Sequence, residues 1–177
     1  MPKQVAGVLV FLLLSTSGPR SGLAVPKKTE EPTNPMTHAK EETEAVLNTL
    51  IPAATLLLEK NGEMFPIGAA MLSSGKISAV ATQMGDEHPS SQKVIDGLNE
   101  ALRAGARQKL YKATGVAIDM RVLPPGESEK TDALAVRLEH VSGYSVQVIL
   151  PYRLHDKRIT FGKTYSITGT NDVFGSH

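Results

Sequence analysis

The chain has 177 residues, of which 41% are hydrophobic and 5% are aromatic, and it contains neither Cys nor Trp. Without cysteine it can form no disulfide, no thiolate metal site and no cysteine nucleophile. Its 19 Lys and Arg residues are balanced by 18 Asp and Glu residues, so it lacks the basic excess that is typical of nucleic-acid-binding proteins.

The first 24 residues have the three parts of a secretory signal peptide. Met1-Pro2-Lys3 supplies a basic start, Val5 to Leu14 is an unbroken apolar run, and a segment of small and polar residues ends at Ala24. We therefore predict cleavage after Ala24 and a secreted or periplasmic mature protein. The alternative is an uncleaved anchor, but the apolar run is well short of the roughly 20 residues that span a bilayer. We expect no stable membrane span after cleavage.

The next segment, Val25 to Lys40, is rich in proline and charge and nearly free of apolar residues. Such a segment cannot bury enough surface to offset its ordering entropy, and it is predicted to be a disordered linker. A single α+β domain is expected over residues 41–163. The Gly-, Ser- and Thr-rich residues 164–177 are expected to form a flexible tail.

A helix is predicted from Glu41 to Asn61, because apolar residues recur at helical spacing and Asn61-Gly62 supplies a stop. Pro52 removes one backbone hydrogen bond and should kink or split this helix. Leu56 points away from the main apolar face. It is either simply exposed or marks a second contact such as a homodimer.

Two strands, a second helix and three further strands follow. The strands are predicted at Phe65–Leu72, Lys76–Met84, Gly115–Leu123, Leu134–Val141 and Tyr144–Tyr152, and the helix runs from Ser90 or Ser91 to about Tyr111. Apolar and polar residues alternate along the last three strands. This alternation predicts a five-stranded antiparallel sheet with one covered face and one wet face, flanked by the two helices.

The order helix, strand, strand, helix, strand, strand, strand over residues 41–162 resembles that of profilin-like and roadblock-like α/β domains. The resemblance implies their fold, in which helices flank a five-stranded antiparallel sheet. Within Asn61 to Ala70, the pattern G-E-x-x-P-x-G-A is similar to a stretch of uncharacterised bacterial proteins. Leu138-Glu139-His140, Gly143-Tyr144 and Leu150-Pro151-Tyr152 are similar to the later part of that pattern. This family implies no activity.

No catalytic or cofactor motif is complete in the sequence. Ser73-x-x-Lys76 and Ser90-x-x-Lys93 match the nucleophile motif of penicillin-recognising enzymes, but the Ser-Asp-Asn and Lys-Thr-Gly elements of those enzymes are absent. A Gly-x-Ser-x-Gly elbow, a His-Glu-x-x-His pair and a phosphate-binding glycine loop are absent too. The five histidines form no close pair on one predicted element. We therefore assign no catalytic residue, no metal and no cofactor.

The best polar cluster lies late in the chain, where Glu139 and His140 end one predicted strand and Tyr152, Arg153 and His155 end the next. Polar decoration of two strand ends explains these residues. As a functional site, they are the candidate binding surface of a non-enzymatic module that binds a partner protein or a small ligand. The alternative is a small hydrolase-like enzyme with Glu139, His140 and Tyr152 in one cleft. Homodimerisation through a strand edge or Leu56 is a third option.

Overall fold

The computed structural model describes residues 34–82, 85 and 89–175, so the predicted signal peptide and residues 25–33 of the predicted linker lie outside the described residues. The described part contains two helices and seven strands. The helices are α1 (Pro35–Asn61) and α2 (Ser91–Arg107). The strands are β1 (Ile67–Leu72), β2 (Ile77–Val80), β3 (Tyr111–Val122), β4 (Thr131–His140), β5 (Ser145–His155), β6 (Arg158–Phe161) and β7 (Tyr165–Thr168).

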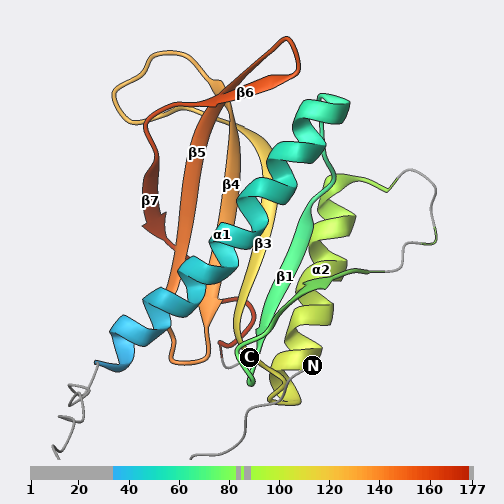
Figure 1. Ribbon diagram of the computed structural model, residues 1–177, viewed down its shortest axis with the longest axis vertical. Helices are drawn as coiled ribbons and strands as arrows, with labels where there is room; N and C mark the ends of the chain where they lie inside the picture. Colours follow the sequence, from blue (N-terminus) through green and yellow to red (C-terminus); the bar gives the residue numbers. More distant parts are fainter. Residues whose placement is uncertain (1–33, 83–84, 86–88, 176–177) are drawn as a thin grey trace, which may run out of the picture. The chain divides into compact units, whose positions relative to one another are not determined.

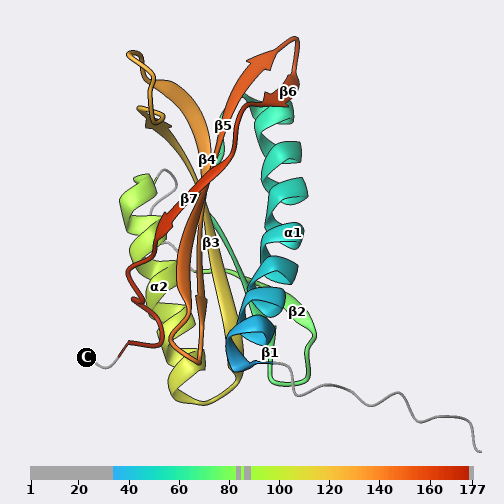
Figure 2. The ribbon, with the colours of Figure 1, turned by 90° about the vertical axis from the view of Figure 1, so that its left-hand side faces the viewer.

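All the strands pair antiparallel in one sheet with the order β2-β1-β3-β4-β5-β6. β7 also pairs with β5, so β6 and β7 follow one another along the same edge of β5. α1 lies across one face of the sheet and α2 lies across the other (Figure 1, Figure 2). These findings confirm the α+β class, the antiparallel sheet and the two flanking helices.

Within the described residues the sheet has seven strands, so the prediction of five is wrong. The two additional strands are β6 and β7, and each is only four residues long. Neither shows the long apolar alternation that marks a half-buried strand. Backbone pairing with the long strand β5 holds them at the edge, and such pairing leaves little trace in the periodicity of a short segment.

Both faces of the sheet are covered by a helix, so the predicted wet face is wrong. On the α1 face, aliphatic side chains of the helix pack on those of the middle strands: Val46, Leu50, Ala54, Leu58, Leu134, Val136 and Leu138. On the α2 face, a second aliphatic cluster joins that helix to β1 and β3: Ala70, Val94, Ile95, Leu98, Leu102, Val116 and Ile118. The prediction failed because small residues in β3 alternate with large ones, and both sets are buried.

α1 approaches β3 closely at Gly115. A Cβ atom at this position would lie 2.7 Å from Leu50 Cδ1 and 2.8 Å from Val46 Cγ1. Carbon atoms pack no closer than about 3.5 Å without strain. The absence of a side chain at Gly115 therefore allows the middle of the helix to lie against the strand.

α1 begins at Pro35, earlier than the predicted start at Glu41, so residues 35–40 of the predicted linker are helical. Asn34 Oδ1 caps the helix by accepting a hydrogen bond from the Met36 N–H at 3.0 Å, and proline is favoured at the first helical position. The helix continues through Pro52 and is not split there. Among the described residues, no helix combines the length and the apolar character that a bilayer span requires.

Residues 165–175 of the predicted flexible tail belong to the fold. β7 pairs with β5, and Val173 is buried in the cluster under α2. The Arg103 Nε–H donates a hydrogen bond to the Asp172 carbonyl oxygen at 2.7 Å. The Gly-, Ser- and Thr-rich composition predicted a flexible tail, but the strand pairing and the hydrogen bond from Arg103 use backbone groups, which every residue carries.

Candidate functional site

Glu139 and His140 are buried at the end of β4, with 6% and 7% of their surfaces exposed. The Glu139 carboxylate accepts hydrogen bonds from the backbone N–H groups of Asp172 at 2.8 Å and Val173 at 2.7 Å. The His140 ring instead contacts Glu42 of α1. Successive strand residues point to opposite faces of a sheet, so these two side chains serve different contacts and do not form one cluster.

Tyr152 lies farther along β5 and has its own partner. Its hydroxyl donates a hydrogen bond to Asp119 Oδ1 at 2.8 Å. Burial, the hydrogen bond and the nearby Asp119 charge together raise the pKa of the Tyr152 hydroxyl well above its ordinary value. Burial, followed by the charges of Asp132 and Glu63, raises the pKa of the Asp119 carboxyl despite the hydrogen bond from Tyr152. The structure therefore does not bring Glu139, His140 and Tyr152 together.

A cluster that the sequence did not suggest is built around His140. Its Nε2 lies 2.8 Å from Glu42 Oε2, and its Nδ1 lies 2.8 Å from Ser142 Oγ. The backbone N–H of Ser142 donates to the same Nδ1 at 3.0 Å. An N–H donor requires an acceptor, so we assign the proton of the neutral ring to Nε2, from which it is donated to Glu42.

Lys112 of β3 completes the cluster by pairing with the other carboxylate oxygen of Glu42. Burial raises the pKa of the Glu42 carboxyl, but the hydrogen bonds from Lys112 and His140, together with the charge of Lys112, outweigh it, so the pKa lies below its ordinary value. The cluster fastens the first turns of α1 to β3 and to the β4–β5 turn. Ser142, His140 and Glu42 thus form a chain of hydrogen bonds, and the same three residue types activate the serine nucleophile of some hydrolases.

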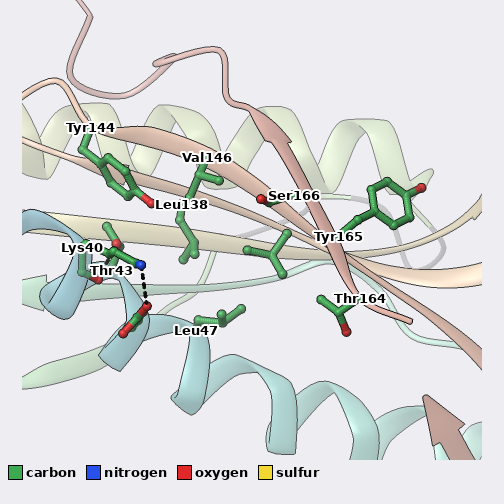
Figure 3. Close-up of a pocket in the computed structure, with 11 residues that line it drawn as sticks. Lys40, Thr43, Leu47, Leu138, Tyr144, Val146, Thr164, Tyr165 and Ser166 are labelled. Atoms are coloured by element: carbon green, nitrogen blue, oxygen red, sulfur yellow. Dashed lines mark hydrogen bonds and ion pairs between the residues drawn. The ribbon is translucent and has the colours of Figure 1, made fainter. Parts of the chain in front are cut away.

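A groove of about 270 Å³ lies between the first half of α1 and the edge formed by β5 and β7 (Figure 3). Its lining is apolar in the middle and polar at the rim: Lys40, Thr43, Glu44, Leu47, Leu138, Tyr144, Val146, Val148, Thr164, Tyr165 and Ser166. Lys40 and Glu44 face one another across 3.9 Å on α1. The groove borders the His140 cluster, because Thr43 follows Glu42 and Tyr144 lies just after Ser142 in the chain.

A larger cleft of about 740 Å³ lies beside the β3–β4 loop, and we name it the Arg153 cleft. The loop forms one wall with Pro124, Pro125, Glu127, Glu129, Lys130 and Thr131. The end of β5, together with β6 and the segment leading into β7, forms the other wall with Pro151, Tyr152, Arg153, Thr160, Phe161, Gly162, Lys163 and Tyr165. Three separate segments of the chain thus meet at this cleft.

The Arg153 cleft contains Tyr152 and Arg153, two of the five residues predicted from sequence. His155 is not part of it: this side chain is 88% exposed and lies 3.1 Å from Asp156 in the β5–β6 turn. In the described part of the chain, no group of three His, Asp or Glu side chains is arranged to hold a metal ion. The Arg153 cleft and the His140 cluster are the candidate functional sites.

Sequence reasoning missed Glu42 and Ser142 for different reasons. Glu42 is 98 residues from its partner His140, and no local pattern reports a contact over that separation. Ser142 is only two residues from His140, and the His-x-Ser spacing before Gly143 was a usable signal for a side chain folded back onto a turn.

The chain matches no protein-family model, no curated protein and no solved structure. The resemblance to profilin-like and roadblock-like domains therefore stays a prediction from element order.

Proposed function

We propose that this chain is a small, non-enzymatic binding module of the cell exterior or periplasm, exported by residues 1–24, which holds a small ligand or a segment of a partner protein in the Arg153 cleft. The observation that carries the proposal is the cleft itself. Its volume of about 740 Å³ falls in the range of about 300–1,000 Å³ that is usual for ligand sites. Both aromatic and charged side chains line it.

The side chains of the cleft support binding better than catalysis. Tyr152, the most buried candidate acid or base on its walls, already donates its hydroxyl proton to Asp119, and its raised pKa keeps it protonated. A general base must be able to accept a proton near the working pH. The exposed charged groups of the cleft can instead pair with a ligand, because a ligand displaces only the water that hydrates them.

Fragment binding followed by nuclear magnetic resonance tests the proposal. Small aromatic fragments are expected to shift the backbone amide signals of residues 124–131 and 151–165, with dissociation constants of about millimolar, the range expected of ligands of this size. Gly162→Trp should abolish these shifts by filling the cleft, since a Cβ at Gly162 meets Pro151 only at ordinary contact distances of 3.6 Å and 3.8 Å.

The matched control is Asn48→Trp on the exposed face of α1, which adds the same indole away from the cleft. It should leave the fragment shifts unchanged. Shifts that are absent from the cleft, or that persist unchanged in Gly162→Trp, would contradict the proposal.

The second candidate function is an esterase-like hydrolase at the His140 cluster, and the Ser142, His140 and Glu42 relay favours it. Ser142 Oγ would attack an ester carbonyl carbon while its proton passes to His140 Nδ1. The ester C–O bond would then break, the proton would pass to the leaving alkoxide, and water would hydrolyse the acyl-serine. This candidate ranks second because Nδ1 already accepts the Ser142 backbone N–H, a bond that proton transfer must break.

A fluorophosphonate probe, which reacts with activated serines, separates the two candidates. The binding module is expected to remain unlabelled at Ser142. Labelling at Ser142 that disappears in Ser142→Ala and in His140→Ala, but persists in Ser128→Ala of the exposed β3–β4 loop, would establish the hydrolase instead.

A further inference from the structure

We infer that the Arg153 cleft recognises an oxyanion, a carboxylate or a phosphate, carried by a ligand with a compact apolar body. The inference rests on the proposed binding function and names the chemistry of the ligand. Three cationic side chains from three segments of the chain line the cleft: Lys130 at the end of the β3–β4 loop, Arg153 on β5 and Lys163 before β7.

These three cations lack ion-pair partners among the described residues, although several other cations have them. Lys112 pairs with Glu42, and the Arg121 Nε lies 3.5 Å from Asp132 Oδ1. Lys40 lies within 3.9 Å of Glu44. Arg153 and Lys163 have no such carboxylate, so their charges are available to a ligand without the loss of an existing bond.

The two walls differ in charge. The loop wall carries Glu127 and Glu129 next to Lys130, whereas the strand wall carries Arg153 and Lys163 and no acidic residue. A negative group is therefore attracted to the strand wall and repelled from the loop wall. Arginine adds geometric preference, because its guanidinium can donate two parallel hydrogen bonds to one carboxylate or phosphate.

The same cleft offers apolar surface for the body of the ligand. Phe161 and Tyr165 are half-buried on the strand wall, and Pro124, Pro125 and Pro151 add rigid aliphatic rings. Aromatic side chains also pack well on a flat ligand ring. An anion without apolar atoms would leave this surface in contact with water, so the structure favours an aromatic or branched aliphatic acid over a free inorganic ion.

Three matched probes test the inference: benzoate, phenyl phosphate and the uncharged benzyl alcohol, each titrated while the amide signals of the cleft are followed. At least one of the two anions should bind at least about five-fold more tightly than benzyl alcohol. Raising the salt concentration should weaken anion binding and leave benzyl alcohol unchanged. Comparison of benzoate with phenyl phosphate shows which oxyanion the cleft prefers.

Arg153→Glu and Lys163→Glu should each weaken anion binding about five-fold or more. Arg158→Glu is the matched control, because it makes the same charge change on the exposed β5–β6 hairpin outside the cleft. It should change binding by less than about two-fold. All three positions are exposed, and unchanged amide signals of the two cores report that each variant is folded.

The outcomes separate this inference from the proposed function. Equal binding of benzyl alcohol and both anions at the cleft overturns the oxyanion inference and keeps the binding module. Equal weakening by Arg158→Glu and Arg153→Glu also overturns it, since a general field effect then explains the charge dependence. Absence of binding by every probe at the cleft overturns both.

Discussion

Glu139 and His140 are neighbours in β4, yet their side chains fasten two different parts of the chain to the sheet. Glu139 holds the C-terminal segment through the N–H groups of Asp172 and Val173. His140 holds the first turns of α1 through Glu42. Residues that the sequence offered as a site are thus the points at which distant segments of the chain are joined.

Glu139→Gln should lower the free energy of unfolding by about 1–3 kcal/mol. A carboxylate bonds backbone N–H groups more strongly than an amide does, and one of its two oxygens is replaced by an NH₂ group that cannot accept. Urea unfolding measures the loss, and hydrogen exchange should accelerate at residues 172–174. Glu127→Gln on the exposed β3–β4 loop is the control, and an equal loss in both variants would refute the role of Glu139.

Glu42 should make stability depend on pH in the acid range. Its pKa is lower in the folded protein than the ordinary value of 4.5, so the folded state binds this proton less tightly than the unfolded state. The contribution is therefore complete above about pH 4.5 and is lost as the pH falls through the folded pKa.

Glu42→Gln should remove that contribution. The unfolding free energies of Glu42→Gln and the parent should differ most at neutral pH and converge as the pH falls through the folded pKa, as chemical denaturation at several pH values can show. Glu44→Gln is the control, because Glu44 is only two residues from Glu42 and is exposed on the same helix. Its unfolding free energy should follow that of the parent at every pH. A difference between parent and Glu42→Gln that is constant with pH would contradict the prediction.

Asp119 should act with the opposite sign. Burial raises its pKa above the ordinary value of 3.8, so its contribution to stability is complete below pH 3.8 and is lost as the pH rises through the folded pKa. Asp119→Asn removes the buried charge and keeps an oxygen that can accept from Tyr152. It should raise the midpoint of thermal unfolding at pH 7 and lose this advantage at pH 3.

The control for Asp119→Asn is Asp156→Asn in the exposed β5–β6 turn, which should leave the midpoint unchanged at both pH values. A lower midpoint for Asp119→Asn at pH 7 would show that the carboxylate contributes more through its hydrogen bond than it costs through burial.

The large elements of the fold were predictable because periodicity reports burial. The alternation of Leu134, Val136 and Leu138 predicted that these side chains face the core, and all three are in the α1 core. β6 and β7 were not predictable in the same way, since four residues are too few for a period to show. In β3 the face under α1 was hidden, because Ala113, Gly115 and Ala117 are too small to give a strong apolar signal while they allow α1 to approach.

The candidate site was predictable only in part. Tyr152 and Arg153 lie in the larger cleft because the last part of β5 faces the β3–β4 loop across an open space. The rest of that cleft comes from residues 124–131 and 160–165, which converge only once β5 is paired with β4 and β6. No single stretch of sequence carries that convergence, and the same holds for Glu42 and His140.

Leu56 is either simply exposed or a homodimer contact, and sedimentation distinguishes the two. It is 65% exposed on α1, in a stretch from Ala45 to Leu58 that contains no charged residue. The parent is expected to sediment as a dimer at high concentration and Leu56→Glu as a monomer, because a charge is costly to bury in an apolar contact. Lys60→Glu, on the exposed surface of α1 beyond that uncharged stretch, is the control for charge and should leave the dimer intact. A parent that sediments as a monomer at every concentration would refute the prediction.

Export should remove residues 1–24 and leave Val25 as the first residue of the mature protein. The apolar run from Val5 to Leu14 is recognised by its hydrophobicity, and the small residues before Val25 fit the cleavage step. Mass spectrometry of protein from the extracytoplasmic fraction should therefore find a chain that begins at Val25. Leu12→Arg, which places a charge inside the run, should leave the full-length chain in the cytoplasm, whereas Leu12→Val should be processed as the parent is. Full-length chain in the membrane fraction would instead establish the uncleaved anchor.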